Sequence, residues 1–116
     1  MKQSGLQMVR KTPEGYVLRS ILDYLASRRY FAMRMNSGAV QDKRGVPIRM
    51  HEPGTADVLA IRPGRIPHLH EVCWIECKAP NGKQSELQKA FQKRVEELGH
   101  TYILAFSIDD LENNGL

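Results

Sequence analysis

Three residues near the middle of the chain have side chains suited to holding a divalent cation beside a phosphate group. Asp57 lies in the segment Gly-Thr-Ala-Asp-Val-Leu-Ala, and Glu76 and Lys78 lie in the later triplet Glu-Cys-Lys. Carboxylate oxygens are the ligands that Mg²⁺ and Mn²⁺ prefer, and a lysine ammonium stabilises the charge that develops on a phosphate under attack. These residue types indicate metal-dependent hydrolysis of phosphodiesters.

Glu76 and Lys78 share one face only if their segment is extended. Residues two apart on a β-strand project from the same face, and neighbours project from opposite faces. Residues 71–78 are rich in β-branched, aromatic and sulfur side chains and end at the Pro-Asn-Gly turn of residues 80–82, which is typical of a strand. The side chains expected on its buried face are Cys73, Ile75 and Cys77.

Asp57 is expected in a neighbouring buried strand. The apolar run 56–61 is bounded by Pro53-Gly54 and Pro63-Gly64, which predicts a short strand between turns. A lone aspartate in such a strand is costly to bury unless it binds a cation.

Length and composition predict one domain. A chain of 116 residues with 41% hydrophobic residues is long enough for a single core, and we expect one domain over residues 1–116, with residues 1–11 as a polar extension. The two cysteines are too far apart on one strand to pair, and the sequence has neither a membrane-spanning apolar run nor a signal peptide. These features predict an intracellular, cytoplasmic protein without a membrane partner.

The net charge of +4 is unevenly distributed. Residues 1–58 carry ten lysines and arginines against five acids, whereas residues 59–116 carry seven against eight. A basic half of this kind favours a polyanionic partner such as nucleic acid, although a merely basic soluble protein has the same balance.

A helix is predicted to begin at Thr12-Pro13-Glu14, where a threonine cap, a first-position proline and a first-turn acid occur together. Its expected apolar face comprises Val17, Leu18, Ile21, Leu22 and Leu25. Glu14 precedes this face by one turn and is a candidate ligand. Its alternative role is to stabilise the helix dipole, which is worth roughly 0.3 to 1 kcal/mol.

The next segments predict a strand over residues 30–35 and a hairpin over residues 39–52 around Asp-Lys-Arg-Gly. Phosphate contacts need charge and donors but no particular spacing. The candidates for such contacts are Arg34, Asn36, Lys43, Arg44, Arg49, Lys83 and Ser85. Solvated surface is the alternative for the basic residues, and Asn-Ser-Gly at residues 36–38 is also good turn chemistry.

A second helix is predicted over residues 85–98, with Ser85 as its cap and Gly99 ending it. The expected buried stripe is Leu87, Phe91, Val95 and Leu98. Gln84, Gln88 and Gln92 repeat along a polar edge, where Gln88 is a candidate to reach a phosphate or a metal-bound water and a solvated row is the alternative. A strand over residues 101–106 and a short helix from Ser107 follow.

Together these motifs resemble the PD-(D/E)XK nuclease superfamily, and more narrowly the VRR-Nuc family in its compact stand-alone viral form. The resemblance rests on Gly-Thr-Ala-Asp57, Glu76-Cys-Lys78 and the Gly-Lys-Gln-Ser segment leading to Gln88, and it extends from Thr12 to residue 106. Ala56 departs from the pattern, because the superfamily has proline before the first strand aspartate. The departure affects backbone shape and removes no ligand.

The resemblance implies a restriction-endonuclease-like α/β fold, with a central mixed sheet flanked by helices. It also implies a Mg²⁺- or Mn²⁺-dependent DNA endonuclease that acts as a homodimer on branched DNA such as Holliday junctions. Asp57, Glu76 and the backbone carbonyl of Cys77 would be metal ligands, with Glu14 contributing directly or through water. Lys78 would be the catalytic lysine and Gln88 the helix glutamine.

Three other interpretations of the sequence remain. Imidazole and thiolate favour zinc, and the candidates would be His51, His68, His70, His100, Cys73 and Cys77, but their spacing matches no common zinc motif. A non-catalytic nucleic-acid-binding module would use the acids as a buried ion pair with Lys78, which leaves excess negative charge. The third interpretation is an RNA-directed nuclease.

Overall fold

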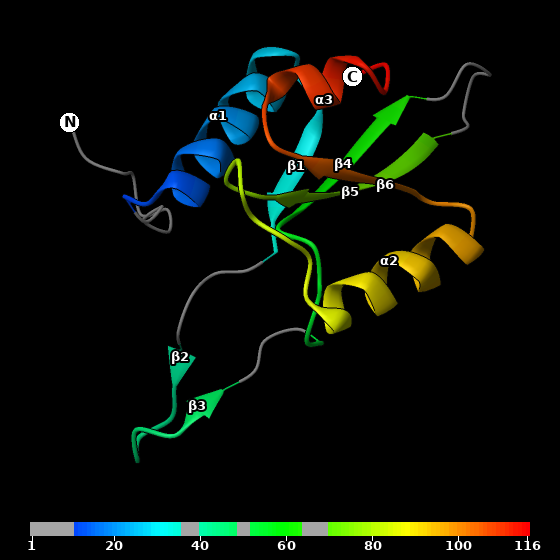
Figure 1. The fold of residues 1–116 in the computed structure, drawn as a ribbon. Coiled ribbons are helices and arrows are strands. Elements are labelled where there is room, and N and C mark those ends of the chain that lie inside the picture. The colour runs from blue at the N-terminus through cyan, green and yellow to red at the C-terminus, as the bar shows by residue number, and fades with distance from the viewer. Residues whose placement is uncertain (1–10, 36–39, 49–51, 64–69) are drawn as a thin grey trace.

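A computed structural model describes residues 11–35, 40–48, 52–63 and 70–116 of the chain. Its main body has three layers, in which a four-stranded mixed sheet lies between two helices on one face and one helix on the other (Figure 1). The elements are α1 (Pro13–Ser27), β1 (Phe31–Arg34), β2 (Val40–Gln41), β3 (Pro47–Ile48), β4 (Val58–Pro63), β5 (His70–Cys77), α2 (Glu86–Glu97), β6 (Thr101–Ala105) and α3 (Ile108–Glu112). The expectation of an α/β protein with a mixed sheet flanked by helices is confirmed.

The strand order in the sheet is β1-β4-β5-β6. β1 pairs with β4 and β4 pairs with β5 in antiparallel fashion, whereas β5 and β6 are parallel. A parallel pair needs a crossover connection, and α2 supplies it between β5 and β6. β4 begins at Val58 rather than within residues 56–57, so Asp57 lies one residue before the strand.

α1 begins as its sequence predicts. The Thr12 hydroxyl accepts a 3.0 Å hydrogen bond from the amide of Gly15, and Pro13 occupies the first turn, where its missing N–H removes no helical bond. Leu18, Ile21 and Leu25 are buried against the sheet.

Each face of the sheet has its own apolar layer. On the face covered by α1 and α3, the buried residues include Val58, Cys73, Ile75, Cys77, Ile103, Ala105 and Leu111. On the α2 face the layer is smaller and consists of Ala56, Val95 and Tyr102, with Trp74, Phe91 and Leu104 packed against them. The predicted buried face of β5 is therefore confirmed, and Glu76 and Lys78 belong to the opposite face.

The predicted buried stripe of α2 is wrong at both of its ends. Leu87 and Leu98 are 57% and 75% exposed, and only Val95 of the helix is fully buried. The small apolar layer beneath the helix reaches its middle, where Phe91 and Val95 pack against Trp74 and Tyr102. The glutamines at residues 84, 88 and 92 are hydrogen-bonded to other side chains, so they do not form a solvated row.

β2 and β3 form a separate two-stranded sheet, which stands away from the body in Figure 1. This confirms the predicted hairpin within residues 40–48. No helix in the described ranges combines the length and apolar character needed to cross a bilayer.

Candidate metal and catalytic centre

Asp57 and Glu76 face each other across the β4–β5 pair. Val58 is paired with Ile75, so the next opposed positions are residues 57 and 76, whose side chains project from the same face. This is the α2 face, at the end of the sheet where β5 finishes. The structure therefore brings together two carboxylates that local sequence places on separate segments.

The backbone of Cys77 contributes to the same place. Its amide donates a 2.8 Å hydrogen bond to Oδ2 of Asp57. In a strand the N–H and C=O of one residue point to the same side, so the Cys77 carbonyl is directed toward the Asp57 side of β5. The Cys77 thiol lies on the opposite, apolar face, where burial raises its pKa and leaves it unsuited to binding a metal.

Glu76 is a buried carboxyl group with an incomplete set of partners. Its relative exposure is 1%, and its Oε1 atom is buried without a hydrogen bond from any described residue. Burial, followed by the charge of Asp57, raises the pKa of Glu76 to about 8. Burial also raises the pKa of Asp57, while the Cys77 amide opposes that shift. At neutral pH the carboxyl groups of Asp57 and Glu76 therefore hold one proton between them, unless a cation other than Lys78 neutralises their charge.

The other oxygen of Glu76 is held by the second helix. Gln88 Nε2 donates a 2.9 Å hydrogen bond to Glu76 Oε2, and Gln88 Oε1 accepts a 2.8 Å bond from the amide of Ser85. Ser85 Oγ in turn accepts a 3.1 Å bond from the amide of Gln88. The capping box uses the Oε1 end of the Gln88 amide and Glu76 takes the Nε2 end, so the direct role of Gln88 in this centre is to orient Glu76.

Lys78 and Glu14 complete the charged group. Lys78 Nζ lies 3.6 Å from Glu76 Oε2 and 4.0 Å from Glu14 Oε1. The lysine side chain is 10% exposed, and the turn containing Gly82 packs against its aliphatic stem. Glu14 extends from the first turn of α1 and is half-exposed. Lys78 thus lies between two carboxylates, and Asp57 adds a third acid opposite Glu76.

A close backbone contact fixes the position of α2 relative to Asp57. At Gly54, where φ is +86°, an added Cβ would clash with the carbonyl oxygen of Leu87. The loop leading to Asp57 therefore lies directly against the turn that carries Gln88. This role of Gly54 is not predicted from the sequence, in which the Pro-Gly pair before the strand is the available signal.

A second network supports the same helix. Gln84 Nε2 donates hydrogen bonds to Tyr102 Oη at 3.1 Å and to Gln92 Oε1 at 2.9 Å. Burial raises the pKa of Tyr102 to about 12, so its hydroxyl remains protonated. These bonds join β6 to the loop before α2.

The described residues fit a hard cation in kind and in charge, since the available donors are oxygens and the group has excess negative charge. Within these parts of the chain, however, no three histidine, cysteine, aspartate or glutamate side chains are close enough together to hold an ion on their own. An ion bound to Asp57 and Glu76 would need main-chain or water ligands as well. The Cys77 carbonyl, on the Asp57 side of β5, is a candidate for a main-chain ligand.

No family model, curated protein or solved structure matches this chain. The assignment of chemistry consequently rests on the side chains and their geometry.

The candidate phosphate-contacting residues are dispersed. Lys43 and Arg44 are exposed on the hairpin, Lys83 and Ser85 lie in the segment before α2, and Arg34 is half-buried at the end of β1. Asn36 and Arg49 lie outside the described residues. Only Lys83 and Ser85 lie in the segment that connects Lys78 to α2.

The zinc interpretation receives no support from the described candidates. Cys73 and Cys77 are buried free cysteines, and His70 is exposed at the start of β5. His100 accepts a 2.9 Å hydrogen bond on Nδ1 from Trp74 Nε1. His51 and His68 lie outside the described residues.

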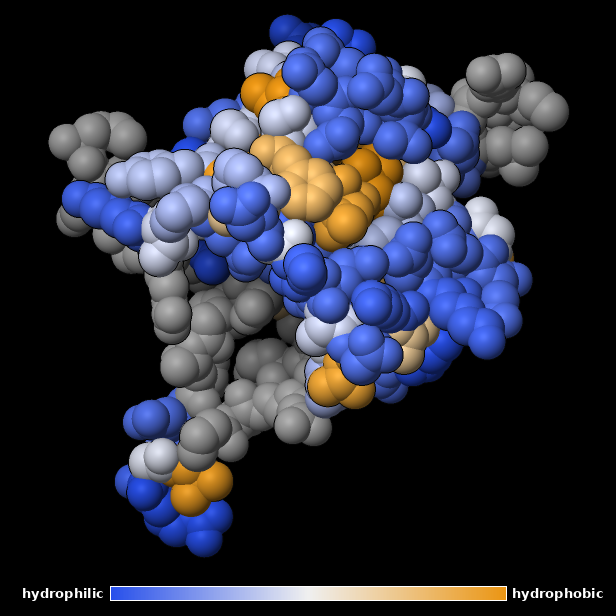
Figure 2. All heavy atoms as spheres, in the orientation of Figure 1, coloured by the Kyte–Doolittle hydropathy of each residue, from blue (hydrophilic) through white to orange (hydrophobic). Residues whose placement is uncertain are grey.

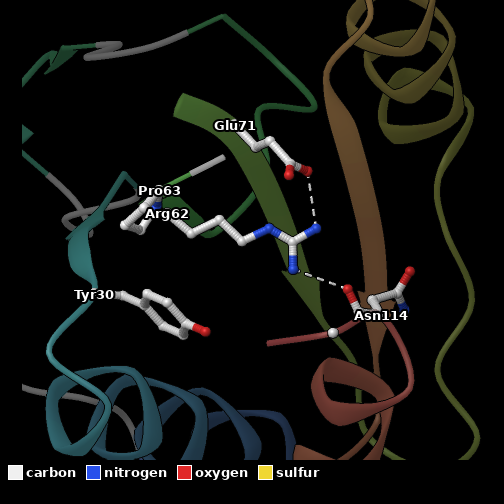
Figure 3. Close-up of a pocket in the computed structure, with 6 residues that line it drawn as sticks. Tyr30, Arg62, Pro63, Glu71 and Asn114 are labelled. Carbon is white, nitrogen blue, oxygen red and sulfur yellow. Dashed lines mark hydrogen bonds and ion pairs between the residues drawn. The ribbon is translucent and has the colours of Figure 1, made fainter. Parts of the chain in front are cut away.

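A pocket of about 530 Å³ lies at the other end of the sheet (Figure 3). Arg62 extends through it and donates hydrogen bonds to Glu71 at 2.9 Å and to the carbonyl of Asn114 at 3.0 Å. Arg62 thereby ties β4 and β5 to the segment after α3. These bonds within the pocket indicate a structural role for the arginine.

Proposed function

We propose that this protein is a metal-dependent nuclease that hydrolyses DNA phosphodiesters. The observation that supports this most strongly is the buried Glu76 carboxyl, which faces Asp57 and has an oxygen without a donor among the described residues. A structural ion pair would balance its charges, whereas here Glu76 and Glu14 share one lysine and Asp57 adds a third carboxyl group opposite Glu76. A divalent cation would neutralise the excess.

The proposed ligands are Asp57, Glu76 and the Cys77 carbonyl, with Glu14 acting directly or through water. Mg²⁺ or Mn²⁺ at these ligands would polarise a phosphate and lower the pKa of a bound water. Asp57 is held by the Cys77 amide and Glu76 by Gln88, so both carboxylates are oriented before an ion binds. Lys78 is positioned to stabilise negative charge on the attacked phosphate.

The order of elements is compatible with the PD-(D/E)XK core that the sequence resembles. The two acids and the lysine lie at one end of a mixed sheet, with a helix on each side to supply Glu14 and Gln88. We extend the proposal to branched DNA and to a homodimer, because symmetrical cutting of a four-way junction requires two active sites related by a twofold axis.

The test is a panel of labelled linear, flap, fork and four-way DNA substrates incubated with Mg²⁺, Mn²⁺ or EDTA. We expect metal-dependent cleavage by the wild-type protein and none by Asp57→Asn, which keeps an acceptor for the Cys77 amide. Binding without cleavage in every metal would favour a non-catalytic DNA-binding module instead. Matched RNA substrates test the RNA-directed alternative, and the mass in solution with and without junction DNA tests the dimer.

A further inference from the structure

The hairpin of β2 and β3 leaves the sheet beside the acidic centre. It is inserted between β1 and β4, and where β1 ends the amide of Met35 donates a 2.7 Å hydrogen bond to the carbonyl of Asp57. From there the hairpin extends away from the three layers (Figure 1). A long substrate bound at Asp57 would therefore also lie near this hairpin.

The tip of the hairpin is ordered by its own hydrogen bonds. Asp42 Oδ1 accepts bonds from the amides of Arg44 at 2.8 Å and Val46 at 3.0 Å. The Asp42 amide donates to the Val46 carbonyl at 2.9 Å, and Gly45 adopts a φ of +81°. These bonds hold the tip in a defined turn.

The tip is also exposed and basic. The Arg44 side chain is 81% exposed, that of Asp42 is 29% exposed, and Lys43 is exposed between them. Arg44 keeps donors beyond the one that pairs with Asp42 at 3.1 Å. Figure 2 shows hydrophilic atoms around a small hydrophobic area on the hairpin.

Such a hairpin suits duplex DNA in size as well as in charge. Its strands are only two residues long, and an isolated two-stranded hairpin is marginally stable in water. A two-stranded β-ribbon fits the major groove, whose edges are lined by phosphates that lysine and arginine can contact. DNA would then add contacts that stabilise the bound hairpin.

We propose that the β2–β3 hairpin is an arm that enters a groove of the duplex next to the acidic centre, with Lys43 and Arg44 contacting phosphates. This inference rests on the proposed function in taking DNA as the substrate. It adds a second point of contact, which fixes the orientation of the duplex relative to Asp57 and Glu76.

The test measures binding of full-length Asp57→Asn protein to a labelled duplex in EDTA over a series of salt concentrations. In that background Lys43→Ala/Arg44→Ala should weaken binding and reduce the slope of log K against log salt by about 2, since each phosphate contact contributes roughly 0.9. The matched control is Arg19→Ala/Arg28→Ala, which removes the same charge from exposed positions of α1 and at its C-terminal end. It should leave the slope near that of the parent. Equal slopes of log K against log salt for the two double variants would show that the hairpin does not contact DNA phosphates.

A second pair of variants tests the shape of the tip at constant charge. Asp42→Asn keeps an acceptor for the amides of Arg44 and Val46, whereas Asp42→Ala removes it. Both add one unit of positive charge relative to the parent. Asp42→Asn should bind DNA at least as tightly as the parent and more tightly than Asp42→Ala. Equal affinities of these two variants would contradict a preorganised arm.

Cleavage assays on the wild-type protein and on the hairpin substitutions made without Asp57→Asn separate this inference from the nuclease proposal. If the wild-type protein cleaves DNA with Mg²⁺ but the hairpin variants bind DNA as tightly as the parent, the proposed role of the hairpin is wrong and the nuclease proposal is supported. If the hairpin variants bind more weakly but no substrate is cleaved under any metal, the nuclease is wrong and the arm stands. A change in oligomeric mass without a change in DNA binding would assign the hairpin to a second copy of the chain and overturn the proposal.

Discussion

Gln88 Nε2 lies 2.9 Å from Oε2 of Glu76, so the first turn of α2 holds one oxygen of a buried carboxyl group. The other oxygen, Oε1, has no donor among the described residues. The helix thus orients the carboxyl group through one oxygen, and the other, buried oxygen has no hydrogen bond from the described residues. The separate contributions of the cap and the Glu76 contact can be measured.

Gln88→Ala should weaken metal binding and cleavage, whereas a substitution that only weakens the helix cap should not. It removes both the bond to Ser85 and the bond to Glu76, whereas Ser85→Ala removes only the cap hydroxyl. Loss of the cap costs about 1 kcal/mol of stability, so both variants should show a lowered Tm. Only Gln88→Ala should need more Mg²⁺ to reach half-maximal cleavage. An equal metal requirement in both variants would show that Gln88 acts only as a cap.

Glu76→Gln should abolish cleavage. In the absence of metal, the variant should become more stable than the wild type as the pH rises. The pKa of Glu76 is about 8 in the folded protein against an ordinary value of 4.5. Between these values the folded state holds a proton that the unfolded state releases, so this group makes stability fall with rising pH. The amide that replaces the carboxyl group in the variant does not titrate, so this source of pH dependence is removed.

The measurement is Tm in EDTA from pH 5 to pH 9. The difference in Tm between Glu76→Gln and the wild type should increase with pH. Mg²⁺ should reduce this difference, because it stabilises only the wild type. Parallel Tm curves in EDTA would contradict the raised pKa of Glu76.

Lys78→Met should separate metal binding from catalysis. Methionine keeps part of the apolar stem that packs against Gly82 but removes the ammonium 3.6 Å from Glu76 Oε2. Without that charge the centre is more negative, so Mg²⁺ should bind as tightly as in the wild type or more tightly. Cleavage should fall by roughly 10²- to 10³-fold if the lysine stabilises charge on the phosphate.

The matched control is Lys93→Met, which removes a charge from an exposed position on α2. Its cleavage rate should stay close to that of the wild type. Thermal shift with Mg²⁺ and single-turnover cleavage give the two readouts for both variants. Wild-type cleavage by Lys78→Met would remove the lysine from the mechanism.

Gly54→Ala should reduce both stability and cleavage, whereas Gly45→Ala should have only a small effect on stability. Both glycines have positive φ, so each substitution carries a strain of about 1 kcal/mol. At Gly54 the new Cβ would also clash with the Leu87 carbonyl oxygen, whereas nothing lies within 4 Å of a Cβ added at Gly45. Relief of that clash should displace the turn carrying Gln88 and cost roughly a further 1 to 3 kcal/mol.

Chemical denaturation compares the two alanine variants directly. Similar losses of unfolding free energy would show that the loop before β4 can move away from α2 without consequence. Retention of full cleavage by a destabilised Gly54→Ala would separate the contact from the acidic centre.

Much of the site is predictable from local sequence because strand periodicity is strict. The alternation along β5 places Cys73, Ile75 and Cys77 together and separates them from Glu76 and Lys78, as the structure confirms. The cap residues Thr12 and Ser85 are likewise recognisable, since their hydroxyls satisfy amides within the same turn.

The inward side of α2 is not predictable in the same way. Helical periodicity shows which residues share a face, but not how far the neighbouring sheet extends beneath them. Leu87 and Leu98 therefore look like core residues in the sequence and are exposed in the structure. The bond from Gln88 to Glu76 depends on the docking of that helix, which no local pattern specifies.

The parallel pairing of β5 with β6 has a consequence for how the protein folds. β4 and β5 should pair early because antiparallel neighbours along the chain close short loops, whereas pairing of β6 with β5 has to close the longer connection through α2. The carboxyl groups of Asp57 and Glu76 would thus meet before Gln88 and Lys78 reach their final positions. A cation that binds the completed centre should therefore slow unfolding more than it speeds folding.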